Sequence, residues 1–481
     1  MRRSLSPVLS QLFPIDRMTK LSYFLLVSVA LITLYGTNLY ADNTWHAGVA
    51  RAVITPKEPV WQLGFLDRTE PAIEVISDLW AKALALQDAD GNKGLIITMD
   101  ILGVKRNVSN VIKNRIADKH GLDKSRIILC PSHTHSGPAI SLTPFEIMPE
   151  NDERFPAILK YTEWFVNRIV ELADEALSTM QPATISTSNG ISRMQVNRRD
   201  DKGSGPIDNL MGPHDYSVPI IKVQAKGEPE KIIAVLFGYA CHPTTLNINK
   251  FSGDWCGFAQ EEIEKRFPDT TAMFFQGACG DITVFPRNGV NFSQHIGEGI
   301  AVVVSCMLKE PMTEQPPRLA VAYTEVALPY GWQPDEEELE SIALLAPHEY
   351  LQGYAKHLLN MIKEKGELDK TYPYYPIQAW KIGNQPLFAL GGEILIQYSI
   401  HVKKMFGEQT FFMGYANDVM AYIPTARAVR EGGYEARESQ IGYAQPGYWS
   451  PEIEKIIVEA AATLGGQVGL KADISKVEFT E

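Results

Sequence analysis

From Gly48 onward, short apolar runs of strand length alternate with amphipathic stretches. Residues 93–102 form one apolar run that contains a polar Asp100 near its end, and residues 126–130 form another. Between them, residues 108–120 place apolar side chains near positions i, i+3 and i+4, a spacing that predicts a helix. This strand–helix–strand order predicts an α/β fold.

Three further apolar runs have the same character, and each ends in a polar or Gly-rich turn. They span residues 232–240, 271–278 and 386–394. Ligands of open α/β sheets gather outside the carboxyl ends of the strands. The turns after these runs are therefore where the sequence predicts the chemistry to lie.

The segments between the runs are of different kinds. Residues 197–215 are rich in Gly, Pro and charge, which predicts a long loop of the kind that serves as a lid or binding loop. Residues 334–366 begin with acidic residues and are predicted to be mostly helical, with a solvated charged face. The aromatic-rich residues 372–380 fit either a pocket wall or the core.

The N-terminal residues carry a pattern of their own. The run Leu21–Tyr35 is apolar and follows the basic Arg17 and Lys20. It is shorter than the roughly 20 residues that a membrane-spanning helix needs. We therefore expect residues 1–41 to be a signal peptide cleaved before Asp42, with an uncleaved anchor or a buried helix as alternatives. Residues 42–481 then form the exported catalytic domain, in the periplasm or outside the cell.

Composition narrows the class of function. The chain of 481 residues is 45% hydrophobic and 21% charged, which is typical of a globular protein. Its formal charge is −12, and loss of residues 1–41, which hold four basic residues and one acid, makes it more negative. An acidic chain without a basic block is not expected to bind nucleic acid. A chain of this length folds without metal staples, so a metal here is expected to be catalytic.

The cysteine pattern does not indicate a thiolate metal site. There are five cysteines, and none forms a CxxC pair. We expect buried, reduced thiols, with a Cys241–Cys256 bridge as an option in an oxidising compartment.

The strongest local pattern is Ser132–Pro138, directly after the run 126–130. Histidines at i and i+2 of an extended segment, His133 and His135, ordinarily point to opposite sides. One could then bind a metal while the other reaches toward substrate, or a bend at Gly137 could let both share a site. The alternative is that both histidines only form structural hydrogen bonds. Their position at the end of a strand favours a role in binding or catalysis instead.

Two more strand ends carry candidate ligands. His242 follows the run 232–240, and Pro243 behind it ends any ladder. Glu393 emerges from an apolar run behind two glycines, where an acid is costly unless it is paired or metal-bound. Two histidines and a glutamate are a common catalytic zinc set. Their wide separation gives no spacing signature, however.

The last two candidates are less specific. The stretch Gly414–Pro424 contains Tyr422, which the residues alone predict to be core. The turn Gly280–Thr283 could donate backbone N–H groups to an oxyanion or be a plain capped turn. Around these positions there is no GxSxG, HExxH or P-loop pattern, so serine-hydrolase, zincin and nucleotide-binding readings lack support.

Taken together and in order, these fragments resemble the neutral (alkaline, non-lysosomal) ceramidase family, over about residues 48–464. The resemblance is carried by HTHSGP (133–138), CHPTTL (241–246), GGE (391–393), AYIPT (421–425), and by ITP (54–56), LGF (63–65) and Arg68. It implies mixed β-sheets flanked by helices. It also implies one zinc ion per chain, bound by two histidines, a glutamate and a tyrosine. The matching ligands are His133, His242, Glu393 and Tyr422.

The resemblance also implies roles for other residues. His135 and Arg198 match positions that act in catalysis and substrate binding, and Thr283 keeps a hydroxyl where the family has a serine. The segment 280–284 lacks the family's Pro-Asn, and no C-terminal immunoglobulin-like domain follows. These two departures leave the substrate open.

The implied reaction is zinc-assisted hydrolysis of an N-acyl amide in a ceramide-like lipid. His135 would carry a proton to the leaving amine, and Arg198 with Thr283 or backbone N–H groups would hold the oxyanion. Three acids are candidates for orienting the histidines: Asp100, Asp254 and Asp281. The alternatives are a zinc hydrolase of a non-sphingoid amide or ester, such as an N-acyl sugar or amino acid, and a non-catalytic exported binding protein. Peripheral contact with a membrane fits a lipid substrate.

Overall fold

The computed structural model describes residues 43–65, 68–148, 152–199 and 209–479. Residues from Thr44 to Glu481 form one compact unit. The predicted signal peptide lies outside the described residues, so its cleavage stays a prediction. Within the described ranges, the model has no helix of sufficient length and apolar character to cross a membrane.

The larger sheet is mixed, as expected for this fold class. Its strand order is β4-β3-β2-β1-β5-β7-β8-β9, with β11 paired to β5. The pairs β3–β4 and β8–β9 are parallel, and the other pairs of the sheet are antiparallel. Its strands are β1 (Trp45–Val53), β2 (Trp80–Gln87), β3 (Lys93–Met99), β4 (Ile127–Pro131), β5 (Gln181–Ile191), β7 (Ser217–Ala225), β8 (Ile232–Tyr239), β9 (Thr271–Gln276) and β11 (Thr313–Glu314).

The second sheet and two short pairs complete the β structure. The second sheet has the order β16-β14-β13-β12-β18, and the short pairs are β10–β6 and β15–β17. These strands are β6 (Gln195–Asn197), β10 (Ile282–Val284), β12 (Leu319–Trp332), β13 (Thr371–Ile382), β14 (Gln385–Leu390), β15 (Glu393–Ile394), β16 (Phe411–Met413), β17 (Tyr422–Ile423) and β18 (Tyr448–Trp449).

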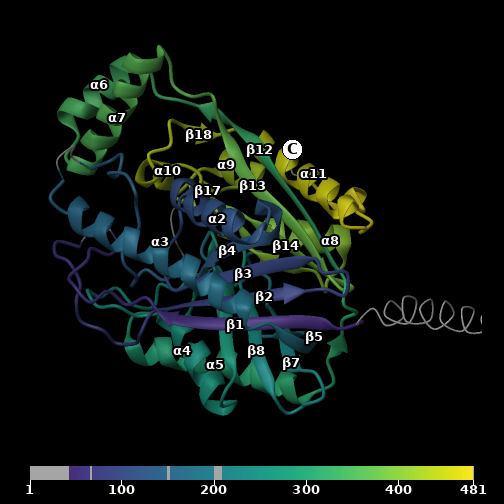
Figure 1. Ribbon diagram of the computed structural model, residues 1–481. Helices are drawn as coiled ribbons and strands as arrows, with labels where there is room; N and C mark the ends of the chain where they lie inside the picture. The colour runs from purple at the N-terminus through teal and green to yellow at the C-terminus, as the bar shows by residue number, and fades with distance from the viewer. Residues whose placement is uncertain (1–42, 66–67, 149–151, 200–208, 480–481) are drawn as a thin grey trace, which may run out of the picture. The chain divides into compact units, whose positions relative to one another are not determined.

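Helices cover the outer faces of both sheets (Figure 1). Helix α3 lies on β1 and β2, α4 and α5 pack together beside β9, β5 and β7, and α11 lies along β12 and β13. The helices are α2 (Arg106–His120), α3 (Phe155–Ser178), α4 (Asp254–Arg266), α5 (Val290–Lys309), α6 (Glu336–Leu345), α7 (Glu349–Lys365), α8 (Ile396–Phe406), α9 (Ala426–Glu431), α10 (Glu438–Gly442) and α11 (Glu452–Gln467), with 3-10 turns η1 (Lys124–Arg126) and η2 (Ile474–Lys476).

The core is layered because each sheet buries both of its faces. Side chains such as Leu84 and Ile96 from the larger sheet meet Trp380 and Leu387 from the second sheet in one buried cluster. On its other side the larger sheet packs against α2 and α3 in a second cluster, and against α4 and α5 in a third. The result is an α/β sandwich of two facing sheets between helical layers.

The predicted elements compare well with this fold. The strands and helix predicted over 93–130 correspond to β3, α2 and β4, and residues 334–366 contain the helices α6 and α7. The aromatic run 372–380 is part of β13, where Tyr375 and Trp380 are fully buried, so this part of the run is core. All five cysteines are free thiols, so the Cys241–Cys256 bridge is not formed.

Candidate metal centre

The site is assembled where the two ends of the larger sheet approach each other. The edge strands β4 and β9 lie close together, and the loops after β4 and β8 carry His133 and His242. The Gln276 side chain, at the end of β9, ties these loops by donating from Nε2 to the Ser132 carbonyl (3.0 Å) and the Cys241 carbonyl (3.1 Å). Two histidine loops that are far apart in sequence are thereby fixed side by side.

The backbone at His133 explains how the two histidines of the HTH motif come together. His133 has φ of 66°, a left-handed conformation that is rare for a residue with a side chain. This bend brings the imidazoles of His133 and His135 into contact, with their Nε2 atoms 3.2 Å apart. The alternation that would point them to opposite sides is therefore wrong here, and the bend lies at His133 rather than at Gly137. Strain of this kind clusters at functional sites.

Both buried histidines present the same nitrogen to the centre of the site. His133 Nδ1 lies 2.6 Å from the Leu102 carbonyl, and His242 Nδ1 lies 2.6 Å from the Cys279 carbonyl. A carbonyl only accepts, so each Nδ1 carries the proton and each Nε2 keeps a lone pair. This is the orientation that metal-binding histidines adopt.

Glu393 and Tyr422 enter the site from the parallel pair β15–β17, in which they are direct partners. Glu393 Oε2 lies 3.2 Å from His133 Nε2 and 3.1 Å from His242 Nε2. The Tyr422 hydroxyl lies 3.3 Å from His242 Nε2. Four donors around one ion at roughly 2.0–2.1 Å would be separated by about 3.3 Å in a tetrahedron, so the spacing fits.

A cation among these donors would be electrostatically favourable. Two imidazole lone pairs face one carboxylate oxygen, and the Glu393 side chain is only 4% exposed. Lone pairs that face each other in a buried site repel unless a proton or a metal ion lies between them. Burial opposes the ionisation of Glu393, but positive charge at His133 and His242 outweighs it and holds the pKa of this carboxyl well below its usual range, so a cation among these groups favours the carboxylate.

His135 lies on the accessible side of the group. It is partly exposed, whereas His133 and His242 are buried. Burial, with His133 and His242 beside it, lowers the pKa of His135 well below its usual value. The ligand atoms of the three histidines all lie within 4.8 Å of one another, so this trio could hold a metal ion. Glu393 Oε2 lies within 3.2 Å of the Nε2 atoms of both buried histidines, and His135 Nε2 lies 3.2 Å from that of His133.

Arg198 reaches the site from the segment after β6. Its Nη2 donates to the Tyr422 hydroxyl (3.0 Å) and to the Gly280 carbonyl (2.7 Å), while Nε donates to Glu435 (3.1 Å). Burial and Glu393 hold the pKa of Tyr422 well above its ordinary value, and the Arg198 guanidinium opposes this shift. The structure therefore brings Arg198 and Tyr422 together, which the residues alone did not indicate.

Thr283 lies on β10 opposite Val196, and its hydroxyl accepts a hydrogen bond from Arg287 Nη1 (3.1 Å). Its expected contact with an oxyanion stays a prediction.

The three buried acids do not bond to the histidine rings, because the ring nitrogens use backbone carbonyls instead. Asp100 accepts from the Trp80 backbone N–H, and Asp281 accepts from the Ile396 N–H and the Asn197 side chain. Asp254 accepts from the N–H groups of Thr245 and Leu246. Their hydrogen bonds fix the loops and strands that carry the site. An effect of these acids on the orientation of the imidazoles would therefore be indirect, and it stays a prediction.

Two tyrosines at the site were not singled out from the sequence. Tyr415, with φ of 58°, lies with its ring 4.5 Å from His133 and its hydroxyl 3.4 Å from Glu393 Oε2. Tyr443 donates a short hydrogen bond to Glu393 Oε1. Tyr415 belongs to the stretch Gly414–Pro424, which offered a signal, whereas nothing in the sequence around Tyr443 marks it.

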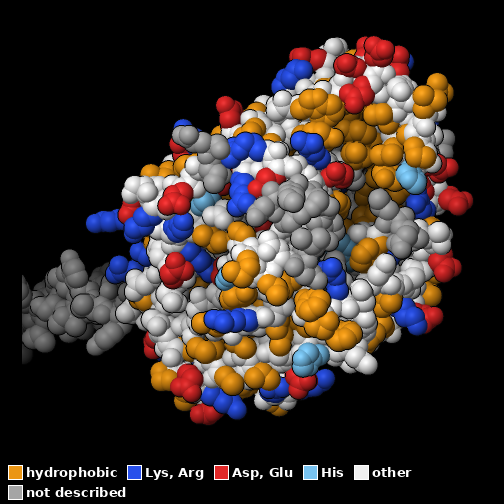
Figure 2. Space-filling model, turned by 180° about the vertical axis from the view of Figure 1, so that it is seen from behind, with side chains coloured by type: hydrophobic (Ala, Val, Ile, Leu, Met, Phe, Trp, Pro, Cys, Tyr) orange, Lys and Arg blue, Asp and Glu red, His pale blue; other side chains and the backbone are white. Residues whose placement is uncertain are grey.

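A cavity of about 600 Å³ has Tyr443 in its wall, and this tyrosine binds Glu393, although none of the four donors lines the cavity. Its wall mixes charged and aromatic side chains, among them Arg106, Asp418 and Tyr372. The charges are paired, since Arg106 binds Glu325 and Tyr372 donates to Asp418. Figure 2 shows hydrophobic and charged side chains interspersed on the face of the molecule behind Figure 1.

Comparisons with known proteins identify the fold. No protein-family model matches the chain. A structure described as a ceramidase complexed with C2 superposes with a TM-score of 0.67 at 17% identity, covering 88% of this chain and 75% of that chain. The neutral ceramidase from Pseudomonas aeruginosa superposes with a TM-score of 0.66 at 17% identity, covering 92% and 79%. The chain therefore has the neutral ceramidase fold, which confirms the predicted fold class.

Proposed function

We propose that the protein is a zinc-dependent amidohydrolase that cleaves the N-acyl amide bond of a ceramide-like lipid. The observation that carries the proposal is the convergence of two imidazole lone pairs and a buried carboxylate oxygen at 3.1–3.2 Å. The fold shared with neutral ceramidases supports the choice of an amide substrate.

His133, His242, Glu393 and Tyr422 would hold the metal. Neutral imidazoles with one carboxylate and one phenol oxygen form a nitrogen–oxygen set of the kind that zinc accepts in catalytic sites. A zinc ion bound there supplies a Lewis acid that polarises a carbonyl and lowers the pKa of water to about 7.

The protein's own residues position the reactants and move the proton. His135 Nδ1 lies 3.1 Å from the Gly64 carbonyl, which fixes the ring with Nε2 directed to His133. Because His135 is the accessible member of the group, it is the residue that exchanges a proton with the leaving amine. Arg198 is held by Gly280 and Glu435, and its fixed positive charge favours a developing oxyanion beside Tyr422.

A second candidate substrate is a polar N-acyl compound, such as an N-acyl sugar or amino acid. The observation that favours it is the charged and aromatic wall of the cavity that touches Tyr443. An apolar slot would suit a long acyl chain, whereas paired charges and phenol groups suit a hydroxylated or zwitterionic group.

The proposal includes export, with residues 1–41 acting as a signal peptide. The intact mass of the protein recovered from its cell of origin tests this point. Cleavage before Asp42 would leave the whole compact unit that begins at Thr44.

The central experiment measures zinc content and amide cleavage together. The purified protein is compared with His133→Ala and with His295→Ala, a control in which an exposed histidine of α5 is removed. Substrates are ceramide in detergent micelles and soluble N-acyl sugars and amino acids. We expect one zinc per chain and ceramide cleavage in the wild type and in His295→Ala, and loss of both in His133→Ala. Cleavage of only the soluble substrates would select the second candidate, and zinc-independent cleavage would refute the proposal.

A further inference from the structure

The two oxygens of the Glu393 carboxylate have different partners. Oε2 faces the Nε2 atoms of His133 and His242 at 3.2 and 3.1 Å. Oε1 accepts the hydrogen bond of the Tyr443 hydroxyl. We propose that Tyr443 is a positioning residue that holds Glu393 as a one-oxygen ligand of the metal centre. This inference rests on the proposed metal site and assigns a role to a residue outside its ligand set.

A carboxylate needs such a partner because its terminal torsion is soft. The last torsion of a glutamate side chain has a broad, two-fold distribution, so a carboxylate without a fixed partner turns freely between its two oxygens. The Glu393 side chain is 4% exposed, so bulk water does not supply that partner. A hydrogen bond from a hydroxyl to a charged oxygen is among the stronger hydrogen bonds in proteins. Tyr443 therefore keeps Oε1 turned away from the two histidines, while the Tyr415 hydroxyl makes a longer contact with Oε2 at 3.4 Å.

Tyr443 is itself held firmly in place. It follows α10 directly, and the next residue, Ala444, has φ of 56°. The Gln445 side chain then donates to the Met420 carbonyl (2.8 Å), and the Gln445 carbonyl accepts from the Tyr354 hydroxyl (3.1 Å). Left-handed backbone at a residue with a side chain persists only where its surroundings enforce it. The loop is thus built to present the Tyr443 hydroxyl at one point.

Tyr443 also contacts a second proposed ligand. Its ring lies edge-on to Tyr422, with centroids 6.4 Å apart and planes at 70°. It further contributes to the wall of the 600 Å³ cavity. One side chain therefore touches a carboxylate donor, a phenol donor and the cavity, whereas an ordinary buried tyrosine needs only one hydrogen-bond acceptor.

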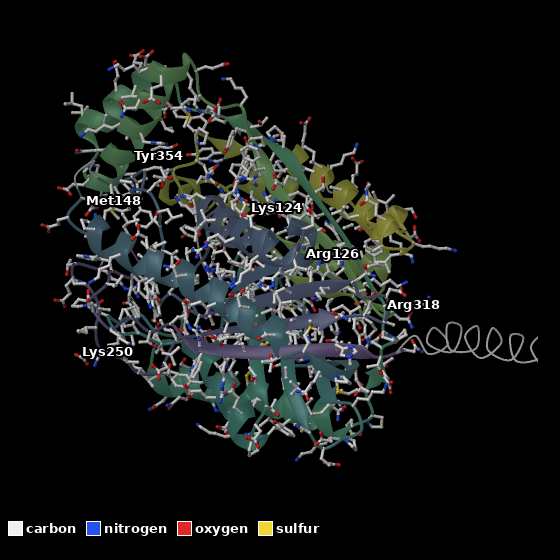
Figure 3. The ribbon with its side chains drawn as sticks, viewed as in Figure 1. Lys124, Arg126, Met148, Lys250, Arg318 and Tyr354 are labelled. Carbon is white, nitrogen blue, oxygen red and sulfur yellow. The ribbon has the colours of Figure 1, made fainter. Side chains whose placement is uncertain are left out.

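The experiment compares Tyr443→Phe with Tyr354→Phe. Tyr354 lies on α7 (Figure 3), and its hydroxyl binds the Gln445 carbonyl of the same loop. Tyr354→Phe therefore removes a tyrosine hydroxyl from this loop without changing a contact of the carboxylate. Zinc affinity of the metal-free proteins is measured by competition with a chelator, and Co²⁺ absorption spectra report the coordination number. Loss of an outer partner of a ligand typically weakens metal binding about 10–100-fold. We expect this loss of zinc affinity in Tyr443→Phe only. The same variant should show weaker Co²⁺ absorption, because its carboxylate can turn and bind the metal through both oxygens.

Several outcomes distinguish this inference from the proposal beneath it. Equal zinc affinity in Tyr443→Phe and the wild type would overturn the role of Tyr443, and equal weakening in both variants would assign the effect to the loop. A wild type that binds no zinc would instead refute the metal site. A double-mutant cycle adds a check, because Tyr443→Phe should have no further effect on zinc affinity in a Glu393→Gln background.

Discussion

Replacing Gly280 with alanine tests whether the turn after β9 sets the position of Glu393. Gly280 donates its N–H to the Ile394 carbonyl at 2.9 Å. A Cβ added to Gly280 would lie 2.5 Å from the Glu393 carbonyl oxygen and 3.1 Å from the Ile394 carbonyl oxygen. A third neighbour, Leu395 Cδ1, would lie at 3.0 Å and can turn away, but the shortest contact is to a backbone atom of β15, which cannot.

The expected effects follow from that distance. To restore an ordinary contact of about 3.4–4.0 Å, the turn and β15 must separate by roughly 0.9–1.5 Å. Metal–ligand distances tolerate only about 0.2 Å, so the shift exceeds what the site can absorb. We expect zinc affinity to fall about 10–100-fold. Overpacking costs about 1–3 kcal/mol, which lowers Tm by only about 1–3 °C in a chain this long, at roughly 2 cal/mol/K of unfolding entropy per residue.

The assay is zinc competition together with thermal unfolding of the metal-free protein. The matched control is Gly466→Ala in α11, where an added Cβ meets no atom within 4 Å. This control should leave zinc affinity unchanged and stabilise the helix by about 0.5–1 kcal/mol. If Gly280→Ala bound zinc as tightly as the wild type, the contact between the turn and β15 would not position the ligand and the reasoning would fail.

Three other predictions address the surrounding structure. Arg198→Met should reduce turnover about 10²–10³-fold, because it removes a positive charge beside Tyr422. It should retain zinc, because the four proposed metal ligands are unchanged. Loss of zinc would show that Arg198 has a structural role instead. Burial lowers the pKa of Lys113 to about 7, so the unfolded chain binds more protons above that pH. The stability of the wild type relative to Lys113→Met should therefore rise by roughly 2–3 kcal/mol, or about 2–3 °C in Tm, between pH 7.5 and 9.5. An unchanged difference in Tm over that range would contradict this assignment. Burial raises the pKa of the Cys130 thiol, and Cys306 is exposed. A maleimide should therefore label one thiol in the native protein and five in denaturant. Labelling of several thiols before unfolding would contradict the buried positions.

The sequence predicts elements well where one pattern dominates. The apolar run 93–102 and the helical spacing of 108–120 need no distant partner to be recognised, and they correspond to β3 and α2. The HTH motif and His242 stand at strand ends, which is where the larger sheet presents them. Local patterning and fold agree in these places because each strand buries its apolar side chains wherever it lies in the sheet.

The rest depends on contacts between distant segments. Gln276 joins the His133 and His242 loops through its side chain, and nothing in the residues around it indicates two carbonyl partners. The pairing of Glu393 with Tyr422 exists only because β15 and β17 run parallel. The histidine rings are held by the backbone carbonyls of Leu102 and Cys279, and a sequence pattern of side chains gives no indication of such backbone partners.

The donors of the proposed site are synthesised in an order that determines when the site can form. A nascent chain that has emerged as far as β9 already contains His133 and His242, and the larger sheet that carries them is then almost complete. Glu393 follows His242 by 151 residues and Tyr422 follows it by 180. A partly made chain therefore contains the three histidines of the site, and the full set of proposed donors would form only after the second sheet has docked. If the proposed site retains its metal through Glu393 and Tyr422, metal occupancy would mark the finished molecule.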